Sequence, residues 1–341
     1  MLFSFAIIAL SFWVLLTIYM LYGRSRMRYL KNIALTGASA EPEVAIIIAV
    51  RNEEEHLAQA LQSVTQLQYS HYRILVINDR STDKTAQILK GFEAAHPHLH
   101  VITIDSLPQG WLGKNHALYT GYKKSNEEWM LFADADVEFE PHALQKAMRH
   151  CLQNHIDHLT VLPHVQSRSS LLNSLMATFL VLLEMRQRPW AVRNPKSTAS
   201  LGVGAFNLVK RSAYEKAGTH TAIALRPDDD LQLGAHIKES GGRSDAVYGT
   251  DQIGLEWYPS VNAFVAGLMK NTFSVFDYNL LKVIVTGVFP LLLFLVLPLP
   301  VLLLFGSITE WWMAAGILAS QIVLFAWPGG MRTQWWYALM V

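Results

Sequence analysis

The run from Leu2 to Tyr22 constrains the fold most, because it is uncharged and almost entirely apolar. A helix of about 20 such residues can cross a bilayer. Positive charge marks the cytoplasmic flank of a span, and basic residues follow this run at once: Arg24, Arg26, Arg28 and Lys31. A signal peptide cleaved near Ala38-Ser39-Ala40 is the alternative, but it would carry its positive charge before the apolar run. We therefore expect residues 1–23 to be an uncleaved anchor, with the following domain in the cytoplasm.

Two more apolar runs lie toward the other end of the chain, Val283–Phe305 and Trp311–Trp327. Three prolines should kink the first run, and bilayer helices tolerate kinks when neighbouring groups satisfy the freed carbonyls. The chain ends in renewed apolar sequence, which is consistent with a truncated last helix. The sequence thus predicts transmembrane helices over 281–341 and a multi-pass protein of the cell (inner) membrane.

The composition supports this interpretation, because half of the residues (51%) are hydrophobic and only 16% are charged, against about a quarter in soluble proteins. The net charge of +1 provides no basic field for nucleic acid, so no nucleic-acid partner is expected. Cys151 is the only cysteine, which excludes an internal disulfide and a thiolate metal cluster.

Between the apolar ends, residues 41–275 alternate between short β-branched runs and helical patterns. Such alternation is typical of an α/β fold with a mostly parallel, Rossmann-like sheet, in which ligands bind at the carboxyl ends of the strands. The expected strands are Val44–Val50, Tyr72–Ile77, Val101–Ile104 and Trp129–Ala133. The expected helices are Glu54–Gln66 and Thr82–Ala95, the second capped by Ser81 or Thr82.

Acidic residues follow these strands. Asp134-Ala135-Asp136 leaves the strand that ends at Ala133, and two carboxylates in this spacing can reach one Mg²⁺ or Mn²⁺ ion. Taken alone, such a triplet is better explained as a solvated turn. Asp79 and Glu53 also follow strands, where each could instead cap or begin a helix.

Two other segments carry candidate chemistry. Lys114 follows Trp111-Leu112-Gly113 in a loop and offers a cation for a diphosphate, unless this loop is an ordinary surface turn. Asp228-Asp229-Asp230 places three acids together; mutual repulsion raises at least one pKa, which suits a general base. The alternative is an acidic helix start, and Asp228 could cap the helix even if Asp230 is catalytic.

Ser170 to Met185 is apolar but short for a membrane span. It is compatible with an interfacial helix beneath which a lipid acceptor enters, or with a buried core helix. The segment Phe264–Phe276 could also lie at the interface.

With these motifs in place, the sequence resembles the family 2 glycosyltransferases, which have the GT-A fold and bind nucleotide sugars. The resemblance covers Val44 to about Asn271. Ile46 to Glu53 is similar to the first strand and its Asn-Glu, and Asn78 to Asp83 is similar to the Asp-Asp-Gly-Ser-Thr-Asp stretch. Arg80 departs from the family at the usual glycine.

The resemblance implies roles for particular residues. The metal ligands would be Asp134 and Asp136, with Mg²⁺ or Mn²⁺ as cofactor. The catalytic pair would be Asp229 and Asp230, with Asp230 as the base; a shifted register would instead make Asp229 or Asp228 the base. The nucleotide sugar would be bound by Val50, Asn52, Glu53, Asp79, Lys114, Asp134 and Ala135.

Gly110 to Lys114, with Ala117, resembles the subgroup that acts on membrane lipids, including ceramide, carotenoid and hopanoid-associated transferases. The Gln-x-x-Arg-Trp signature of processive synthases is absent from the sequence, and Glu256-Trp257-Tyr258-Pro259 stands in that region. The expected activity is therefore inverting transfer of a single sugar, from a UDP-hexose, to a lipid in the bilayer. The alternatives are a polyprenyl-phosphate sugar synthase, a nucleotidyltransferase and an inactive membrane scaffold.

Overall fold

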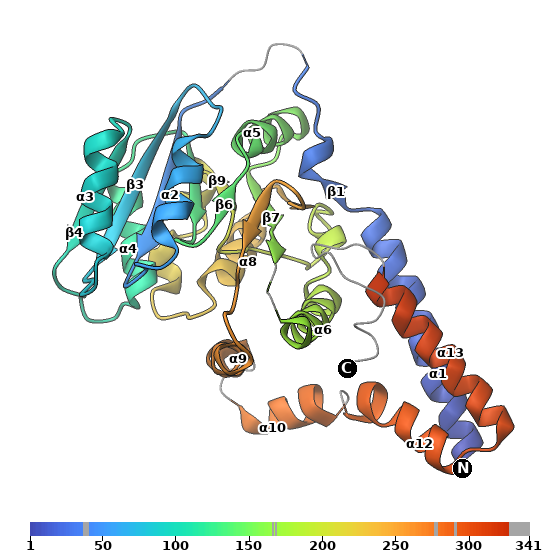
Figure 1. The fold of residues 1–341 in the computed structure, drawn as a ribbon. Coiled ribbons are helices and arrows are strands. Elements are labelled where there is room, and N and C mark those ends of the chain that lie inside the picture. Colours follow the sequence, from blue (N-terminus) through green and yellow to red (C-terminus); the bar gives the residue numbers. More distant parts are fainter. Residues whose placement is uncertain (37–40, 166, 168, 276–278, 290–291, 327–341) are drawn as a thin grey trace. The chain divides into compact units, whose positions relative to one another are not determined.

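A computed structural model describes residues 1–36, 41–165, 167, 169–275, 279–289 and 292–326 (Figure 1). The chain forms two compact units. We call the unit of residues 27–165 and 187–256 the α/β unit, and the unit of residues 1–26, 166–186 and 257–341 the helical unit.

An eight-stranded sheet forms the centre of the α/β unit, in the order β1-β10-β7-β9-β5-β2-β3-β4. All neighbouring strands are parallel except at β9, which runs antiparallel to β5 and β7. The strands are β1 (Arg28–Tyr29), β2 (Val44–Val50), β3 (Tyr72–Asp79), β4 (Leu99–Ile104), β5 (Trp129–Ala133), β7 (His158–Leu162), β9 (Asn207–Lys210) and β10 (Ser244–Tyr248). The predicted mostly parallel α/β fold is confirmed.

Helices cover both faces of this sheet (Figure 1). Side chains alternate along a strand, so in β2 the side chains of Ile46 and Ile48 join one core and that of Ile47 joins the other. The helices of the first face are α2 (Leu57–Thr65), α3 (Thr85–Ala95) and α5 (Ala143–Asn154). The helices of the second face are α4 (Gly113–Lys123), α7 (Arg211–Lys216) and α8 (Asp229–Glu239).

A second, three-stranded sheet has the order β6-β11-β8. It consists of β6 (Glu138–Phe139), β11 (Ile253–Leu255) and β8 (His164–Val165). Three short 3-10 helices complete the α/β unit: η1 (Leu30–Asn32), η2 (Pro189–Ala191) and η3 (His220–Ile223).

The predicted strands are all present, but α2 and α3 begin three residues later than the sequence suggested. The prediction that Ser81 or Thr82 caps α3 is wrong, because Lys84 precedes the helix. The residues between β3 and α3 form a loop instead, in which Asp83 Oδ1 accepts a hydrogen bond from Thr85 N. The helix α8 ends at Glu239, and Gly241 beyond it adopts a positive φ of 85°, a conformation that commonly ends helices.

Among the residues that the structure describes, the helical unit contains two helices that are long and apolar enough to cross a membrane, α1 (Leu2–Ser25) and α13 (Ile308–Ala326). These helices pack against each other. Thr17 Oγ1 donates to Ser320 O at 3.2 Å, and Arg24 forms a buried ion pair with Glu184 at 2.8 Å. The remaining helices of this unit are α6 (Ser170–Gln187), α9 (Val261–Val275), α10 (Leu280–Lys282), the π-helices η4 (Val283–Val288) and η5 (Leu292–Val296), and α12 (Pro298–Phe305).

The described part of the predicted second span, Val283–Phe305, contains the π-helices η4 and η5 and the α-helix α12, which begins at Pro298. Pro290 and the predicted last helix lie outside the described residues. The segments 166–186 and 257–275, which the sequence assigned to the catalytic domain, belong to the helical unit by their contacts.

Candidate active site

The carboxyl ends of β5, β2 and β3 lie at one edge of the sheet, because these strands are adjacent and parallel. Asp134 and Asp136 follow β5, Glu53 lies three residues beyond the end of β2, and Asp79 ends β3. The sheet order therefore gathers the acids that the sequence singled out after separate strands.

Lys114 lies within this group of acids. Its Nζ is 2.7 Å from Asp134 Oδ1 and 3.8 Å from Asp229 Oδ2. Lys114 is the second residue of α4, and the preceding Gly113 begins the helix. Partial loss of hydration acts to lower the pKa of Lys114, whose side chain is 41% exposed, but the neighbouring carboxylates, Asp134 first, outweigh this effect and raise it. The lysine therefore stays charged and links the strand-end acids to those of α8.

The carboxyls of Glu53 and Asp136 are destabilised as anions. Burial, followed by repulsion from Asp136 and Asp134, raises the pKa of Glu53 to about 7. Burial and then Asp134 raise the pKa of Asp136 to about 6. Negative charge thus exceeds positive charge at this corner of the site, and a bound cation would relieve the excess.

The donor set fits a hard divalent cation. Carboxylate oxygens suit Mg²⁺ and Mn²⁺, which use few protein ligands and complete their coordination with water and substrate phosphates. Over the residues that the structure describes, no three His, Cys, Asp or Glu side chains form a ready-made metal cage. A site in which Asp134 and Asp136 hold the ion together with a diphosphate is compatible with both observations.

The three acids at the start of α8 have different surroundings. Both oxygens of Asp228 accept from the Arg226 guanidinium at 3.0 Å, and Gln232 Nε2 donates to Oδ2 at 2.7 Å. Burial opposes these hydrogen bonds, but they hold the pKa of Asp228 below its ordinary value. Asp228 directly precedes α8 without forming a side-chain capping bond. Its engagement with Arg226 disfavours Asp228 as the base.

Asp229 and Asp230 face the same cavity as Lys114 and Asp134. Asp230 Oδ2 accepts from Gly204 N at 2.9 Å, and its Oδ1 accepts from Leu231 N at 2.8 Å. Burial raises the pKa of both carboxyls, while Lys114 opposes this effect. The cavity therefore joins the predicted catalytic pair to the first acid of the predicted metal triplet.

The segment Gly202–Gly204 was missed by the sequence interpretation. A Cβ on Gly204 would lie 2.4 Å from Asp134 Oδ2, and one on Gly202 would lie 1.9 Å from Asp230 O. Both positions therefore need glycine so that the chain before β9 can pass close to the acids. The Gly-x-Gly pattern ahead of a short strand was the available signal.

Two further polar residues of the cavity, Asn207 and His220, were also missed. Asn207 Oδ1 forms a short hydrogen bond with His158 Nε2, and the ring of His220 bonds to the Tyr214 hydroxyl at 2.6 Å. Both histidines are buried. No local pattern in the sequence marks these residues, because tertiary packing brings them to the site.

The remaining predicted nucleotide-binding residues differ in their exposure and in their hydrogen bonds. Asn52 has a positive φ of 55°, and its Oδ1 accepts from Thr82 N at 2.8 Å, which joins the loops after β2 and β3. The side chains of Val50 and Ala135 are buried, so they could meet a ligand only through their main chains. Both oxygens of Asp79 accept from Arg80, at 2.8 and 3.0 Å.

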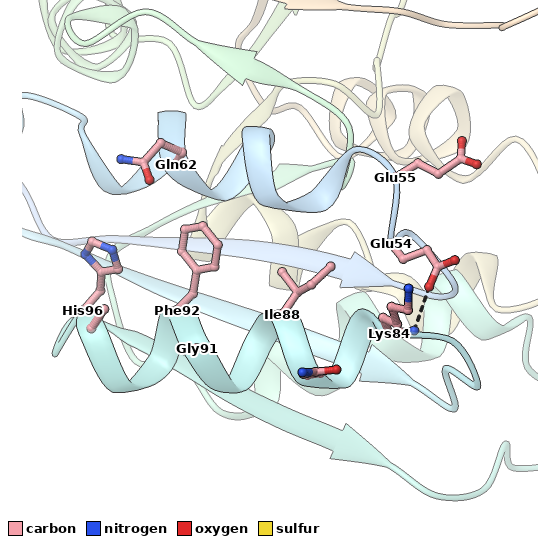
Figure 2. A pocket seen from close by; sticks show the side chains of 10 residues that line it. Glu54, Glu55, Gln62, Lys84, Ile88, Gly91, Phe92 and His96 are labelled. Carbon is pink, nitrogen blue, oxygen red and sulfur yellow. Dashed lines mark hydrogen bonds between the residues drawn. The ribbon is translucent and has the colours of Figure 1, made fainter.

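A separate open groove lies between α2 and α3 and contains none of the predicted site residues (Figure 2). Ile88 and Phe92 supply apolar side chains, and Glu54 Oε2 accepts from Lys84 N at 2.9 Å at one end. We assign it no part in the chemistry of the acid cluster.

Comparisons with known proteins identify the class. The chain superimposes on the mannosyltransferase PcManGT from Pyrobaculum calidifontis, solved with GDP-Man and Mn²⁺, with a TM-score of 0.59 and 17% identity over 100% of this chain and 97% of that one. This likeness shows the fold: the protein has the architecture of GT-A glycosyltransferases. The profile of glycosyl transferase family 2 matches residues 45–218. The chain therefore belongs to glycosyl transferase family 2.

Two relatives are similar at lower coverage. The 4,4'-diaponeurosporenoate glycosyltransferase of Staphylococcus haemolyticus is 26% identical over 220 residues, which are 63% of this chain and 56% of the relative. The poly-beta-1,6-N-acetyl-D-glucosamine synthase of Staphylococcus epidermidis is 24% identical over 230 residues, 66% of this chain and 53% of the relative. The chain thus spans about half the length of these curated relatives.

Proposed function

We propose that this protein transfers a single sugar from a nucleotide sugar, a UDP-hexose, to a membrane lipid, with inversion at the anomeric carbon. The observation that carries the proposal is the shared cavity of Lys114, Asp134, Asp229 and Asp230. A cation bound at Asp134 would lie beside candidate proton acceptors in this arrangement. The similarity to a carotenoid glycosyltransferase supports a lipid acceptor.

Asp134 and Asp136 would hold Mg²⁺ or Mn²⁺. A bound divalent ion supplies electrostatic stabilisation of the charge that develops on the leaving diphosphate. Lys114, which stays protonated beside Asp134, adds a second positive charge for the same diphosphate. Glu53 and Asp79 would complete the nucleotide site at the ends of β2 and β3.

Asp230 would act as the general base. The amides of Gly204 and Leu231 orient its carboxylate, which would take the proton of the acceptor hydroxyl as that oxygen attacks the anomeric carbon. Such help contributes roughly 10²–10⁴-fold. Asp229 is the second candidate, since its carboxyl is buried against Lys114.

The helical unit would anchor the enzyme. In this proposal α1 and α13 span the cell (inner) membrane, the segment 281–305 lies in the bilayer, and the catalytic domain faces the cytoplasm. The basic residues that follow α1 favour this orientation. The helices α6 and α9 would lie at the interface and would admit a lipid. The rings of Phe179 in α6 and Phe264 in α9 contact each other, with their centroids 6.2 Å apart.

The test uses membranes that contain the full chain, a radiolabelled UDP-hexose and extracted lipids. We expect label in the lipid phase that requires Mn²⁺ or Mg²⁺ and falls at least about 100-fold in Asp230→Asn. The Asp229→Asn variant assigns the base between the two acids. Full transfer by Asp230→Asn to a hydroxyl acceptor would exclude Asp230 as the base.

The products separate the alternative activities. A polyprenyl-phosphate sugar synthase would form a product labile to mild acid, and its acceptor, already ionised, would make Asp230 less important. A nucleotidyltransferase would release diphosphate rather than a nucleoside diphosphate. The similarity to a polysaccharide synthase makes a polymer the further alternative, which the size of the labelled product would reveal. An inactive scaffold would give no label.

A further inference from the structure

Arg80 adopts a backbone conformation that is unfavourable for an arginine. It follows the last residue of β3 with a φ of 56°, in the left-handed region that is unfavourable for a residue with a Cβ. Its guanidinium donates hydrogen bonds to both oxygens of Asp79, from Nε at 2.8 Å and from Nη2 at 3.0 Å. Residues with a strained backbone cluster at functional sites, and a bidentate ion pair holds this one in place.

The ion pair leaves the Asp79 carboxylate almost inaccessible, whereas part of the Arg80 guanidinium stays exposed. The Asp79 side chain is 4% exposed, and Gly113 lies so close that a Cβ there would be 2.4 Å from Asp79 Oδ2. The Arg80 side chain is 26% exposed, and its Nη1 has no hydrogen-bond partner among the residues that the structure describes. This corner therefore offers N–H donors rather than a free carboxylate.

A second polar atom at the same corner lacks a partner. His116 Nδ1 is buried without a hydrogen bond to any described residue. His116 lies one turn after Gly113 in α4, interacts electrostatically with Asp79 and Arg80, and packs edge-on to Trp111 at 5.6 Å. Buried polar atoms normally have partners, so the unpartnered His116 Nδ1, beside the partly exposed Arg80 guanidinium, marks a place where a ligand could bind.

The position of Arg80 indicates which part of a nucleotide it would meet. The strand β3 lies two strands from β5, which carries the proposed metal ligands. Strands are spaced about 4.8 Å apart, so the two corners are separated by about 10 Å. A nucleoside diphosphate is long enough to span this separation. If its diphosphate lies at Asp134 and Asp136, its base lies at Asp79 and Arg80.

We propose that Arg80 selects the base of the sugar donor by donating from its guanidinium to the carbonyl oxygen at C4 of uracil or C6 of guanine. This inference rests on the proposed function. Uracil and guanine present such an oxygen, whereas cytosine and adenine present an amino group at the equivalent position, which would face another donor. The Asp79 carboxylate, which could otherwise accept from an amino group, is held by Arg80. The site therefore discriminates keto bases from amino bases.

The experiment measures the binding of UDP, GDP and CDP to the full-length protein in detergent with Mn²⁺, by calorimetry. We expect the wild type to bind UDP or GDP at least about tenfold more tightly than CDP. This ratio is the effect of one hydrogen bond from Arg80 that UDP or GDP can accept and CDP cannot. Arg80→Gly removes the guanidinium, suits the positive φ and frees Asp79. The preference should fall below about threefold, mainly because CDP binds more tightly. Lys90→Met, on the exposed face of α3, is the matched control and should leave the preference unchanged.

Each other result has a defined meaning. If the wild type binds UDP but Arg80→Gly keeps the full preference over CDP, Arg80 does not select the base, while the proposed function stands. A wild type that prefers CDP also overturns the role of Arg80. If no nucleoside diphosphate binds in the presence of Mn²⁺, the proposed function fails together with this inference.

Discussion

At the scale of single residues, Gly204 positions two of the acids through its backbone amide and its lack of a side chain. Gly204 donates its amide to Asp230 Oδ2 and leaves no room for a Cβ next to Asp134. We predict that Gly204→Ala reduces sugar transfer at least about tenfold, because the methyl group displaces Asp134, and small displacements at a catalytic centre are costly. The measurement is the initial rate of transfer at saturating donor.

Gly254→Ala provides the control for this prediction, since the nearest atom to a Cβ at that position is 3.9 Å away. Its activity and thermal stability should match those of the wild type. A Gly204→Ala enzyme with unchanged activity would show that the close contact with Asp134 is unimportant for transfer.

The residues of the site were predictable to different degrees. Glu53, Asp79 and Asp134 each follow a strand in the sequence, and parallel strands bring such residues to one edge. The contacts of Gly204, Asn207 and His220 are made with distant parts of the chain, so no periodic pattern in the sequence predicts them. The ion pair of Arg80 with Asp79 was equally hidden, because it depends on a positive φ at a non-glycine residue.

At the scale of secondary-structure elements, one buried ion pair connects three helices of the helical unit. Arg24 in α1 pairs with Glu184 in α6 at 2.8 Å, and its Nη1 also donates to Leu324 O in α13 at 2.7 Å. We predict that Glu184→Ala destabilises this unit by about 3 kcal/mol, because it leaves the Arg24 charge buried without its carboxylate. Thermal unfolding of the purified protein in detergent would detect the change.

The double variant Arg24→Met/Glu184→Leu tests the cause. Replacing both partners with apolar side chains removes the uncompensated charge, so most of the lost stability should return. Equal destabilisation of the single and double variants would show that packing, rather than charge, is responsible.

The elements themselves were largely predictable, but their ends and order were not. Long apolar runs indicated α1 and α13, and β-branched runs indicated β2, β3 and β5. The later start of α3 reflects the loop at 80–84, where Asn52 Oδ1 accepts from Thr82 N and so competes with helix formation. The four-residue β9 was missed, since a strand this short has no clear period, and its antiparallel place between β5 and β7 depends on the whole sheet.

At the scale of the whole molecule, His158 couples the stability of the α/β unit to pH. Burial lowers its pKa from the ordinary 6.5 to about 4. Between these values the unfolded chain binds more protons than the folded one, so this histidine's contribution is complete above pH 6.5 and is lost as the pH falls toward 4. The raised pKa values of Glu53 and Asp136 act in the opposite direction, so the effect of His158 must be measured as a difference.

We predict that the stability difference between the wild type and His158→Gln decreases by about 2 kcal/mol between pH 7 and pH 5. Glutamine can still hydrogen bond but does not titrate. Urea unfolding of metal-free protein at each pH gives the two free energies. A difference that is constant with pH would contradict the assignment of a neutral buried histidine.

In the proposed function, the acid cluster of the α/β unit transfers one sugar to a membrane lipid. The most direct test is mass spectrometry of lipids from cells that produce either the wild type or Asp136→Asn, which lacks a proposed metal ligand. The account predicts a lipid that carries one added hexose in the wild-type cells alone. Identical lipids in both cells, or a hexose polymer in place of the singly glycosylated lipid, would contradict it.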